Sequence, residues 1–370
     1  MKRRIQISNG MLIAIIINIV YAKSIGVTQG ILARQAGGDM WLITIFSTIL
    51  GLGVMWLMVK IIKRYPDKNI FEHMNVLTGK WGEKLIGLCI FIFFLGAFGT
   101  VMITVVYHLH DFFLPDLPIY IFVVLIVGVG IYGIMKGVEV ISRLALLGVF
   151  SIIILNILLL LGSLDYFTIR EFFPVLRNGF FNAVEVTKHH NADWAMAIFM
   201  VAILLPMVKE KEKWTKSSRV AMIYSGLLIL MWPILEVGVL SPELTGQYLV
   251  SCMQMARSAE IGLFIHRYEL IMVIFFAMSA LIQVMMCLLC GTISVKHLLG
   301  MKKINGLFIP VSLIMGGFGY WVVSDHNRAM DLLTYYWPPI AMPITFGVPI
   351  VIFLLGLVLK RKGGAKEVSS

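Results

Sequence analysis

The chain has 370 residues, of which 59% are hydrophobic and only 14% are charged, and its mean hydropathy is +0.91. This composition excludes a soluble globular domain and is typical of a protein that crosses a membrane many times. The net charge of +11 does not indicate a nucleic-acid partner, because the basic residues lie in the loops between apolar runs and do not gather on one face.

The N-terminus, "MKRRIQISNGMLIAIIINIV", resembles a signal peptide in its charge and its apolar run. However, the run continues without an A-x-A-like cleavage site, and further apolar segments follow. We therefore expect it to be retained as the first membrane helix.

Apolar runs long enough to cross a bilayer, about 20 residues each, occur ten times. The predicted spans are 9–31, 40–62, 84–108, 119–135, 144–164, 183–208, 217–240, 269–295, 304–324 and 339–359. The predicted fold class is thus all-α, and an even number of spans returns both termini to one side of the membrane.

The distribution of basic residues predicts on which side of the membrane both termini lie. If the N-terminus is cytoplasmic, 23 of the 31 Lys and Arg residues fall on the cytoplasmic side, many of them in "KIIKRYPDK" and "KEKEKWTKSSR". The positive-inside rule expects this asymmetry. We therefore predict a multi-pass protein with cytoplasmic N- and C-termini.

The long polar segment "DYFTIREFFPVLRNGFF" at 165–181 divides the single transmembrane domain, 1–370, into a first repeat at 9–164 and a second at 183–359. Five spans per half require the two halves to have inverted topology. Inverted repeats of this kind place a substrate site near the middle of the membrane, beside discontinuous helices.

Both halves begin with a polar interruption in an apolar segment. Helix 1 contains "AKSIGVTQG", and helix 6 contains "EVTKHHNADWAMAIFMVAILLP", where Asp193 starts the apolar part and Pro206 closes it. We therefore expect helices 1 and 6 to be discontinuous, since a break at membrane depth is tolerated where protein or a water-filled cavity satisfies the backbone.

Lys23 is the main candidate site residue, because a charge at membrane depth usually faces a cavity or a partner. Ser24, Gly26 and Thr28 are also unusual in a lipid-facing helix, so we expect all four to line a central cavity and Asp193 to contribute to it. Two alternatives remain: Lys23 extends to the outer interface, and Asp193 lies at the outer mouth of helix 6.

Several motifs together carry a family resemblance that runs nearly end to end. They are "FEHMNVLTGKWGEKLIGL", "FFLPDLPIY", "GIYGIMKGVEVISRL", "LSPELTG" and "ARSAEIGLFIHRYELIMVIF". In order and spacing the chain resembles the integral-membrane B subunits of the nutrient germinant receptors of bacterial spores, within the amino acid–polyamine–organocation transporter superfamily.

The resemblance implies a LeuT-like fold and a sensor of a small nutrient, often an amino acid, in the inner membrane of the spore. The implied partners are a receptor A subunit and a lipoprotein C subunit. Carried over by position, the implied pocket consists of Lys23, Ala97, Ala197, Gln283 and Cys287.

The chain departs from the family pattern at two positions. The family usually has a small residue where this chain has Lys23, and commonly a glutamate where it has Met200. The Lys23 ammonium is therefore expected to bind a ligand carboxylate, to occupy the position of a coupling cation, or to face a carboxylate of the protein such as Asp193.

Other polar residues are expected to be structural. Arg143, Arg267 and Glu269 lie at helix ends and are interpreted as anchors that fix how helices meet. His189 and His190 are interpreted as solvated histidines of a loop.

The segment between the second and third spans predicts a helix at the membrane interface, with Phe71, Met74, Leu77 and Trp81 at helical spacing. The cysteines lack neighbouring ligands, so no metal or cofactor is expected. Enzyme motifs such as G-x-x-x-x-G-K-[ST] or H-E-x-x-H do not occur. Two functions stay open, a subunit of a nutrient receptor and a secondary transporter of amino acids or amines.

Overall fold

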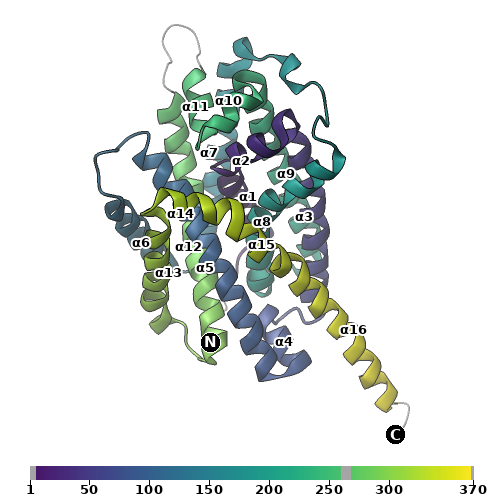
Figure 1. Ribbon diagram of the computed structural model, residues 1–370. Helices are drawn as coiled ribbons and strands as arrows, with labels where there is room; N and C mark the ends of the chain where they lie inside the picture. Colours follow the sequence, from purple (N-terminus) through teal and green to yellow (C-terminus); the bar gives the residue numbers. More distant parts are fainter. Residues whose placement is uncertain (1–5, 260–267, 368–370) are drawn as a thin grey trace.

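A computed structural model describes residues 6–259 and 268–367, with side chains up to residue 358. The described chain forms a bundle of helices, most of them roughly parallel to one long axis (Figure 1). The longer helices, together with the short α2 that follows α1, are α1 (Asn9–Ser24), α2 (Thr28–Ala36), α3 (Met40–Ile62), α5 (Lys80–His110), α6 (Ile119–Lys136), α7 (Val138–Ser163), α8 (Phe180–Leu204), α9 (Trp214–Leu235), α12 (Tyr268–Leu299), α13 (Phe308–Val323) and α16 (Val348–Glu367). Shorter helices are α4 (Ile70–Thr78), α10 (Pro242–Gln247), α11 (Ser251–Ser258), α14 (His326–Asp331) and α15 (Trp337–Met342).

The apolar runs explain why helices dominate, since only a helix or a closed barrel satisfies its backbone hydrogen bonds within lipid. Within the described ranges, nine helical segments are long and apolar enough to cross a membrane, and α1 is a shorter apolar helix. With α1 they account for the ten predicted spans, and α3 coincides with the predicted span 40–62. The protein is therefore an all-α, multi-pass membrane protein.

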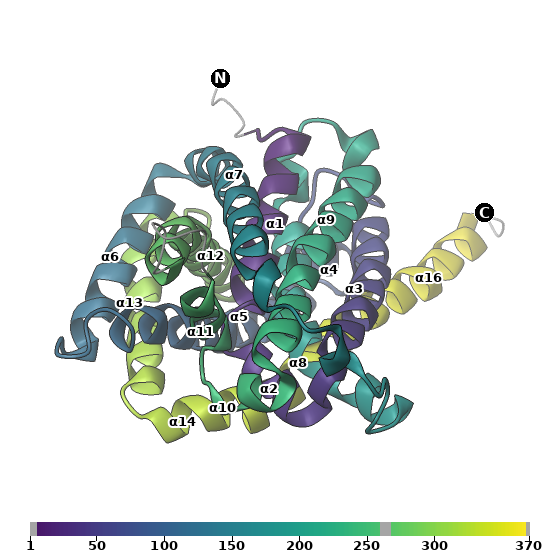
Figure 2. The same ribbon diagram turned by 90° about the horizontal axis from the view of Figure 1, so that it is seen from above.

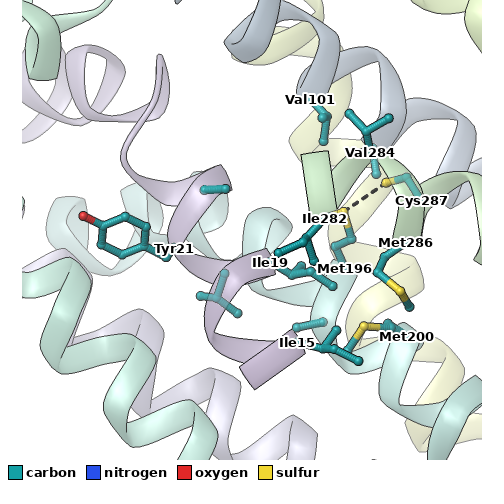
Figure 3. Packing of buried hydrophobic residues seen from close by; sticks show 14 of the residues in the cluster. Ile15, Ile19, Tyr21, Val101, Met196, Met200, Ile282, Val284, Met286 and Cys287 are labelled. Atoms are coloured by element: carbon teal, nitrogen blue, oxygen red, sulfur yellow. Dashed lines mark hydrogen bonds between the residues drawn. The ribbon is translucent and has the colours of Figure 1, made fainter. Parts of the chain in front are cut away.

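The core of the bundle surrounds α1 and α8. Seen along the bundle, α1 lies between α7, α9 and α12 (Figure 2). On one side of α1, Ile15 and Ile19 pack towards Met196 and Met200 of α8, while Tyr21 points to the other side (Figure 3). These two helices are therefore the innermost elements, and polar groups on them are shielded from solvent.

The discontinuity predicted in the first helix is present, because α1 ends at Ser24 and α2 begins at Thr28. The discontinuity predicted in the sixth helix is wrong. Helix α8 runs unbroken from Phe180 to Leu204, and Pro206 lies in a following 3-10 turn, Leu205–Met207. Two of its polar residues, His189 and Asp193, find partners on α2 and α1 without any opening of the helix.

The predicted interfacial helix corresponds to α4, whose first turn is closed by a reciprocal pair of hydrogen bonds between Asn69 and Glu72. Phe71 and Met74 are buried, whereas Trp81 is exposed. Gly79, with φ of 78°, turns the chain from α4 into α5, a conformation that glycine adopts without a steric cost. Helix α4 thereby covers the end of the bundle where both chain termini lie (Figure 1).

Candidate functional site

The break between α1 and α2 lies inside the protein. Its three residues, Ile25, Gly26 and Val27, are all buried. A Cβ added at Gly26 would lie 2.5 Å from the methyl group of Thr104 on α5, so glycine is what allows α5 to approach the break. The interrupted backbone is thus enclosed by neighbouring helices, as a break at membrane depth requires.

Two opposite charges meet at this break. The Lys23 Nζ atom lies 3.1 Å from Asp193 Oδ1, and each side chain is only 3% exposed. The Thr28 hydroxyl donates a hydrogen bond of 2.9 Å to the other carboxylate oxygen of Asp193. Neither alternative position is therefore adopted: Lys23 does not extend to an interface, and Asp193 does not lie at a solvated mouth.

The ends of the two half-helices explain where each charge lies. Lys23 is in the last turn of α1, where the carbonyl ends of the helix favour a cation. The Asp193 carboxylate binds Thr28, the first residue of α2, where unpaired N–H groups favour an anion. The ion pair therefore neutralises the two helix ends that the break creates.

Several polar atoms near the break have no hydrogen-bond partner within the part of the chain that the structure describes. They are Ser24 Oγ, Gln29 Oε1, both ring nitrogens of His190 and Gln283 Oε1. Their residues lie along the broken helix and its neighbours: the Gln29 amide donates to the Ser24 carbonyl at 2.7 Å, and the Gln283 amide donates to the Ile19 carbonyl at 3.0 Å. Buried polar groups normally have partners, so these atoms have unused hydrogen-bonding capacity that a polar guest or an ordered water would satisfy.

The remaining residues of the expected pocket lie in apolar surroundings. Ala97 on α5 and Ala197 on α8 are buried in the hydrophobic core. The Cys287 thiol on α12 contacts the sulfur of Met196 at 3.1 Å (Figure 3). The break thus brings Lys23 and Asp193 together with Thr28, next to Ser24 and Gly26, while Ala97, Ala197 and Cys287 belong to the surrounding hydrophobic core.

The interpretation of His189 and His190 as solvated loop residues is wrong. Both lie within α8 and are buried, 3% and 0% exposed. The His189 Nε2 atom is 3.1 Å from Gln35 Oε1 on α2. The polar approach to the sixth helix is therefore part of that helix, and it packs against α2.

The expected anchors differ from each other in the structure. Arg143 pairs with Glu139 at 2.7 Å, but both belong to α7 and are exposed, so the pair does not join two helices as expected. Glu269 is buried in the first turn of α12. Arg267 lies outside the described residues.

A second buried polar cluster was not predicted. Glu236, in a π-helical turn at Glu236–Leu240, is fully buried and accepts a hydrogen bond of 3.0 Å from Ser251. Next to it, the Cys252 thiol lies 3.4 Å from His108 Nε2. The signal was available, since Glu236 is a charged residue at the end of the apolar run "LLILMWPILEVGVL". Within residues 6–259 and 268–367, no group of three His, Cys, Asp or Glu side chains is placed to hold a metal ion.

Solved structures with the same arrangement of helices define the class of fold. MhsT in complex with L-phenylalanine superimposes with a TM-score of 0.62 over 96% of this chain and 99% of that chain, at 13% identity. An Eremococcus coleocola manganese transporter superimposes with a TM-score of 0.59 over 92% of this chain and 77% of that chain, also at 13% identity. The fold is therefore that of the LeuT-like transporters.

The sequence places the chain within that class. A family described as spore germination protein matches residues 6–319, so the chain belongs to the spore germination protein family. Spore germination protein KB of Bacillus subtilis is 22% identical and covers 96% of both chains. Spore germination protein GerQB of Bacillus cereus is 25% identical over 89% of this chain and 90% of the relative.

Proposed function

We propose that this protein is the integral-membrane subunit of a spore nutrient germinant receptor, which binds a small nutrient at the break between α1 and α2 and thereby triggers germination. The proposed partners are a receptor A subunit and a lipoprotein C subunit, and the proposed location is the inner membrane of the spore or cell. Membership of the spore germination protein family supports this role over that of an enzyme.

One observation carries the ligand proposal, namely the buried Lys23–Asp193 pair across two half-helix ends, with polar atoms around it that lack partners. An amino acid has the same two charges as this pair. Its carboxylate can bind beside Lys23 and the first N–H groups of α2, and its ammonium can bind Asp193 and the last carbonyls of α1. The apolar side formed by Ala97, Ala197 and Cys287 then faces the side chain of the ligand.

Binding of a zwitterion would separate Lys23 from Asp193, because each charge would turn to the ligand. Helix α1 would then shift slightly against α8, which changes how the two innermost helices of the bundle pack on each other. This is the step that we propose to be passed to the partner subunits. It needs a ligand whose contacts favour the separated arrangement, since a ligand shifts an equilibrium only by its differential affinity.

The test uses the full chain purified in a neutral detergent and a panel of the twenty L-amino acids, with simple sugars and nucleosides as comparison nutrients. A ligand that binds only the folded state at 100 times its Kd stabilises it by about 2.7 kcal/mol, so thermal unfolding reports binding. We expect one or a few amino acids to raise the Tm. A panel without any effect on Tm would contradict nutrient binding.

Variants locate the binding event. Lys23→Met and Asp193→Asn should abolish the ligand-dependent rise in Tm, whereas Arg143→Gln, which breaks only an exposed pair within α7, should retain it. A rise that survives both central substitutions would place the ligand elsewhere in the bundle.

A secondary transporter of amino acids or amines is the second candidate, because the solved structures that share the fold include a transporter. Fold alone does not decide function. Uptake of a radiolabelled ligand into proteoliposomes would favour transport, and binding without uptake would favour the receptor. Neighbouring genes for a large membrane subunit with a soluble domain and for a small lipoprotein would also favour the receptor.

A further inference from the structure

A cavity of about 690 Å³ lies where the end of α3, the interfacial helix α4 and α16 meet, apart from the broken helix. Helix α4 and the lower half of α16 lie at the end of the bundle that holds both termini (Figure 1). The lining residues are Ile61, Arg64, Tyr65, His73, Val76, Leu77, Ile352, Gly356 and Leu357. Most of the wall is thus apolar, with a basic group at the rim.

Arg64 lines this cavity, and two further cations, Lys60 and Lys68, lie beside it. Lys60 and Arg64 lie over the ring of Phe353, at 5.5 and 4.9 Å, and Lys68 lies 5.6 Å from the ring of Tyr65. No described carboxylate forms an ion pair with any of the three. The rim therefore carries positive charge that the described chain itself does not neutralise.

The wall also contains a buried histidine. His73 is only 1% exposed, and its Nδ1 atom lies 3.1 Å from the Asn69 carbonyl. Its other ring nitrogen, Nε2, has no hydrogen-bond partner among the described residues. Because this nitrogen is itself buried, His73 forms part of the wall and is not a contact for an occupant.

The outer side of the cavity is bounded by a helix whose surface is apolar. Val351, Leu354 and Val358 of α16 are 52%, 53% and 54% exposed, so this side of the helix faces the hydrocarbon of the membrane. A molecule in the cavity thus has basic groups at one end and membrane hydrocarbon at the other.

We propose that this cavity binds an anionic phospholipid of the surrounding membrane. The phosphate would contact Arg64 and Lys60, and one acyl chain would lie along Ile352 and Leu357. Basic pockets between membrane helices bind anionic headgroups, and guanidinium groups match phosphate oxygens in geometry. A free phosphate ion would gain nothing from the apolar walls, so the occupant is a lipid.

The experiment measures binding of a short-chain phosphatidylglycerol to the full chain in neutral detergent by native mass spectrometry. Phosphatidylcholine of the same chain length, glycerol phosphate and inorganic phosphate are measured alongside. We expect phosphatidylglycerol to bind at least tenfold more tightly than the other three. The double variant Lys60→Gln/Arg64→Gln should lose at least tenfold in affinity for it.

Two further variants make the result specific. Lys136→Gln removes a cation that lies 5.0 Å from the ring of Tyr132 away from this cavity, and it should leave binding unchanged. Val76→Trp retains every charge but fills the cavity from a half-exposed position, and it should weaken binding as the double variant does.

Equal affinity for phosphatidylcholine, or phosphatidylglycerol binding that both cavity variants retain, would overturn the proposal and leave the surface to another protein chain. Tight binding of glycerol phosphate or inorganic phosphate would equally overturn it, in favour of a soluble anion.

Discussion

Lys23 of α1 and Asp193 of α8 form an ion pair from which solvent is excluded, with a separation of 3.1 Å between Nζ and Oδ1. Both ions lose their hydration in the core, and the attraction between them offsets this cost only while both are present. The stability of the break between α1 and α2 therefore depends on α8. A ligand that binds one of the two charges must also provide a partner for the other.

Removal of either charge alone should destabilise the protein strongly. Lys23→Met leaves a buried carboxylate held by Thr28 alone, and Asp193→Asn leaves a buried ammonium. Loss of one partner of a buried pair costs about 3–5 kcal/mol. We expect a lower Tm of the purified protein and lower abundance in the membrane for both single variants.

The double variant Lys23→Met/Asp193→Asn is the control for this coupling. Because it leaves no uncompensated charge, it should recover much of the lost stability, with a coupling free energy in the range of about 0.5–3 kcal/mol that contacting residues show. Additive effects of the two substitutions on Tm would exclude energetic coupling between the two charges.

The sequence predicts the broken first helix well because its signals are local. A lysine and two glycines within a single apolar run cannot face lipid at low cost. The continuity of α8 depends instead on distant residues: Asp193 and Thr28 are 165 positions apart along the chain, and no local pattern shows that one will satisfy the other. For the same reason His189 is read from the sequence as a loop residue, although in the fold it contacts Gln35 of α2.

Tertiary packing also determines where each residue of the expected pocket lies in the fold. Ala97 and Ala197 are small and apolar, so their own chemistry gives no indication of a site, and their burial in the core follows only from the fold. Glu236 is the opposite case, because an acidic residue at the end of an apolar run could have been identified from the sequence.

Gly148 of α7 should not tolerate a side chain. A Cβ there would overlap the amide of Asn18, whose Nδ2 atom donates to the carbonyls of Ala14 and Ala145 and whose Oδ1 accepts from Ser279. The amide cannot move away without breaking these bonds. Gly148→Ala should therefore destabilise the protein by about 1–3 kcal/mol.

A thiol-reactive dye measures this change, because Cys252, Cys287 and Cys290 are buried and react only on unfolding. The matched control is Gly128→Ala on α6, where nothing lies within 4 Å of the added carbon. It should leave the Tm unchanged or slightly higher, since alanine favours a helix over glycine. Equal effects of the two substitutions would contradict the close approach of α1 and α7.

His73 on α4 should make stability depend on pH. Burial lowers the pKa of this imidazole below its ordinary value of 6.5, and the nearby Lys68 also lowers it. The unfolded chain then binds a proton near pH 6.5 that the folded chain does not, so stability is present above this pH and falls as the pH decreases below it. The slope contributed is at most about 1.4 kcal/mol per pH unit.

The check compares the Tm at pH 7.5 and pH 5.5 in neutral detergent for the wild type and for His73→Gln. We expect the variant to lose less stability between the two values. An identical loss in both proteins would mean that His73 titrates alike in the folded and unfolded states.

The orientation of the bundle gives the last prediction. With ten spans, 23 of the 31 basic residues of the sequence fall on the side of the two termini, and the positive-inside rule assigns that side to the cytoplasm. Lys213 is exposed on this side, and Arg177 is exposed in the long segment before α8. In a Cys89→Ser background, a membrane-impermeant maleimide added to intact cells should label Arg177→Cys and spare Lys213→Cys. Permeabilised cells provide the control, because both cysteines should then react. Labelling of Lys213→Cys from outside would invert the topology and would place the cavity beside Arg64 in the outer leaflet.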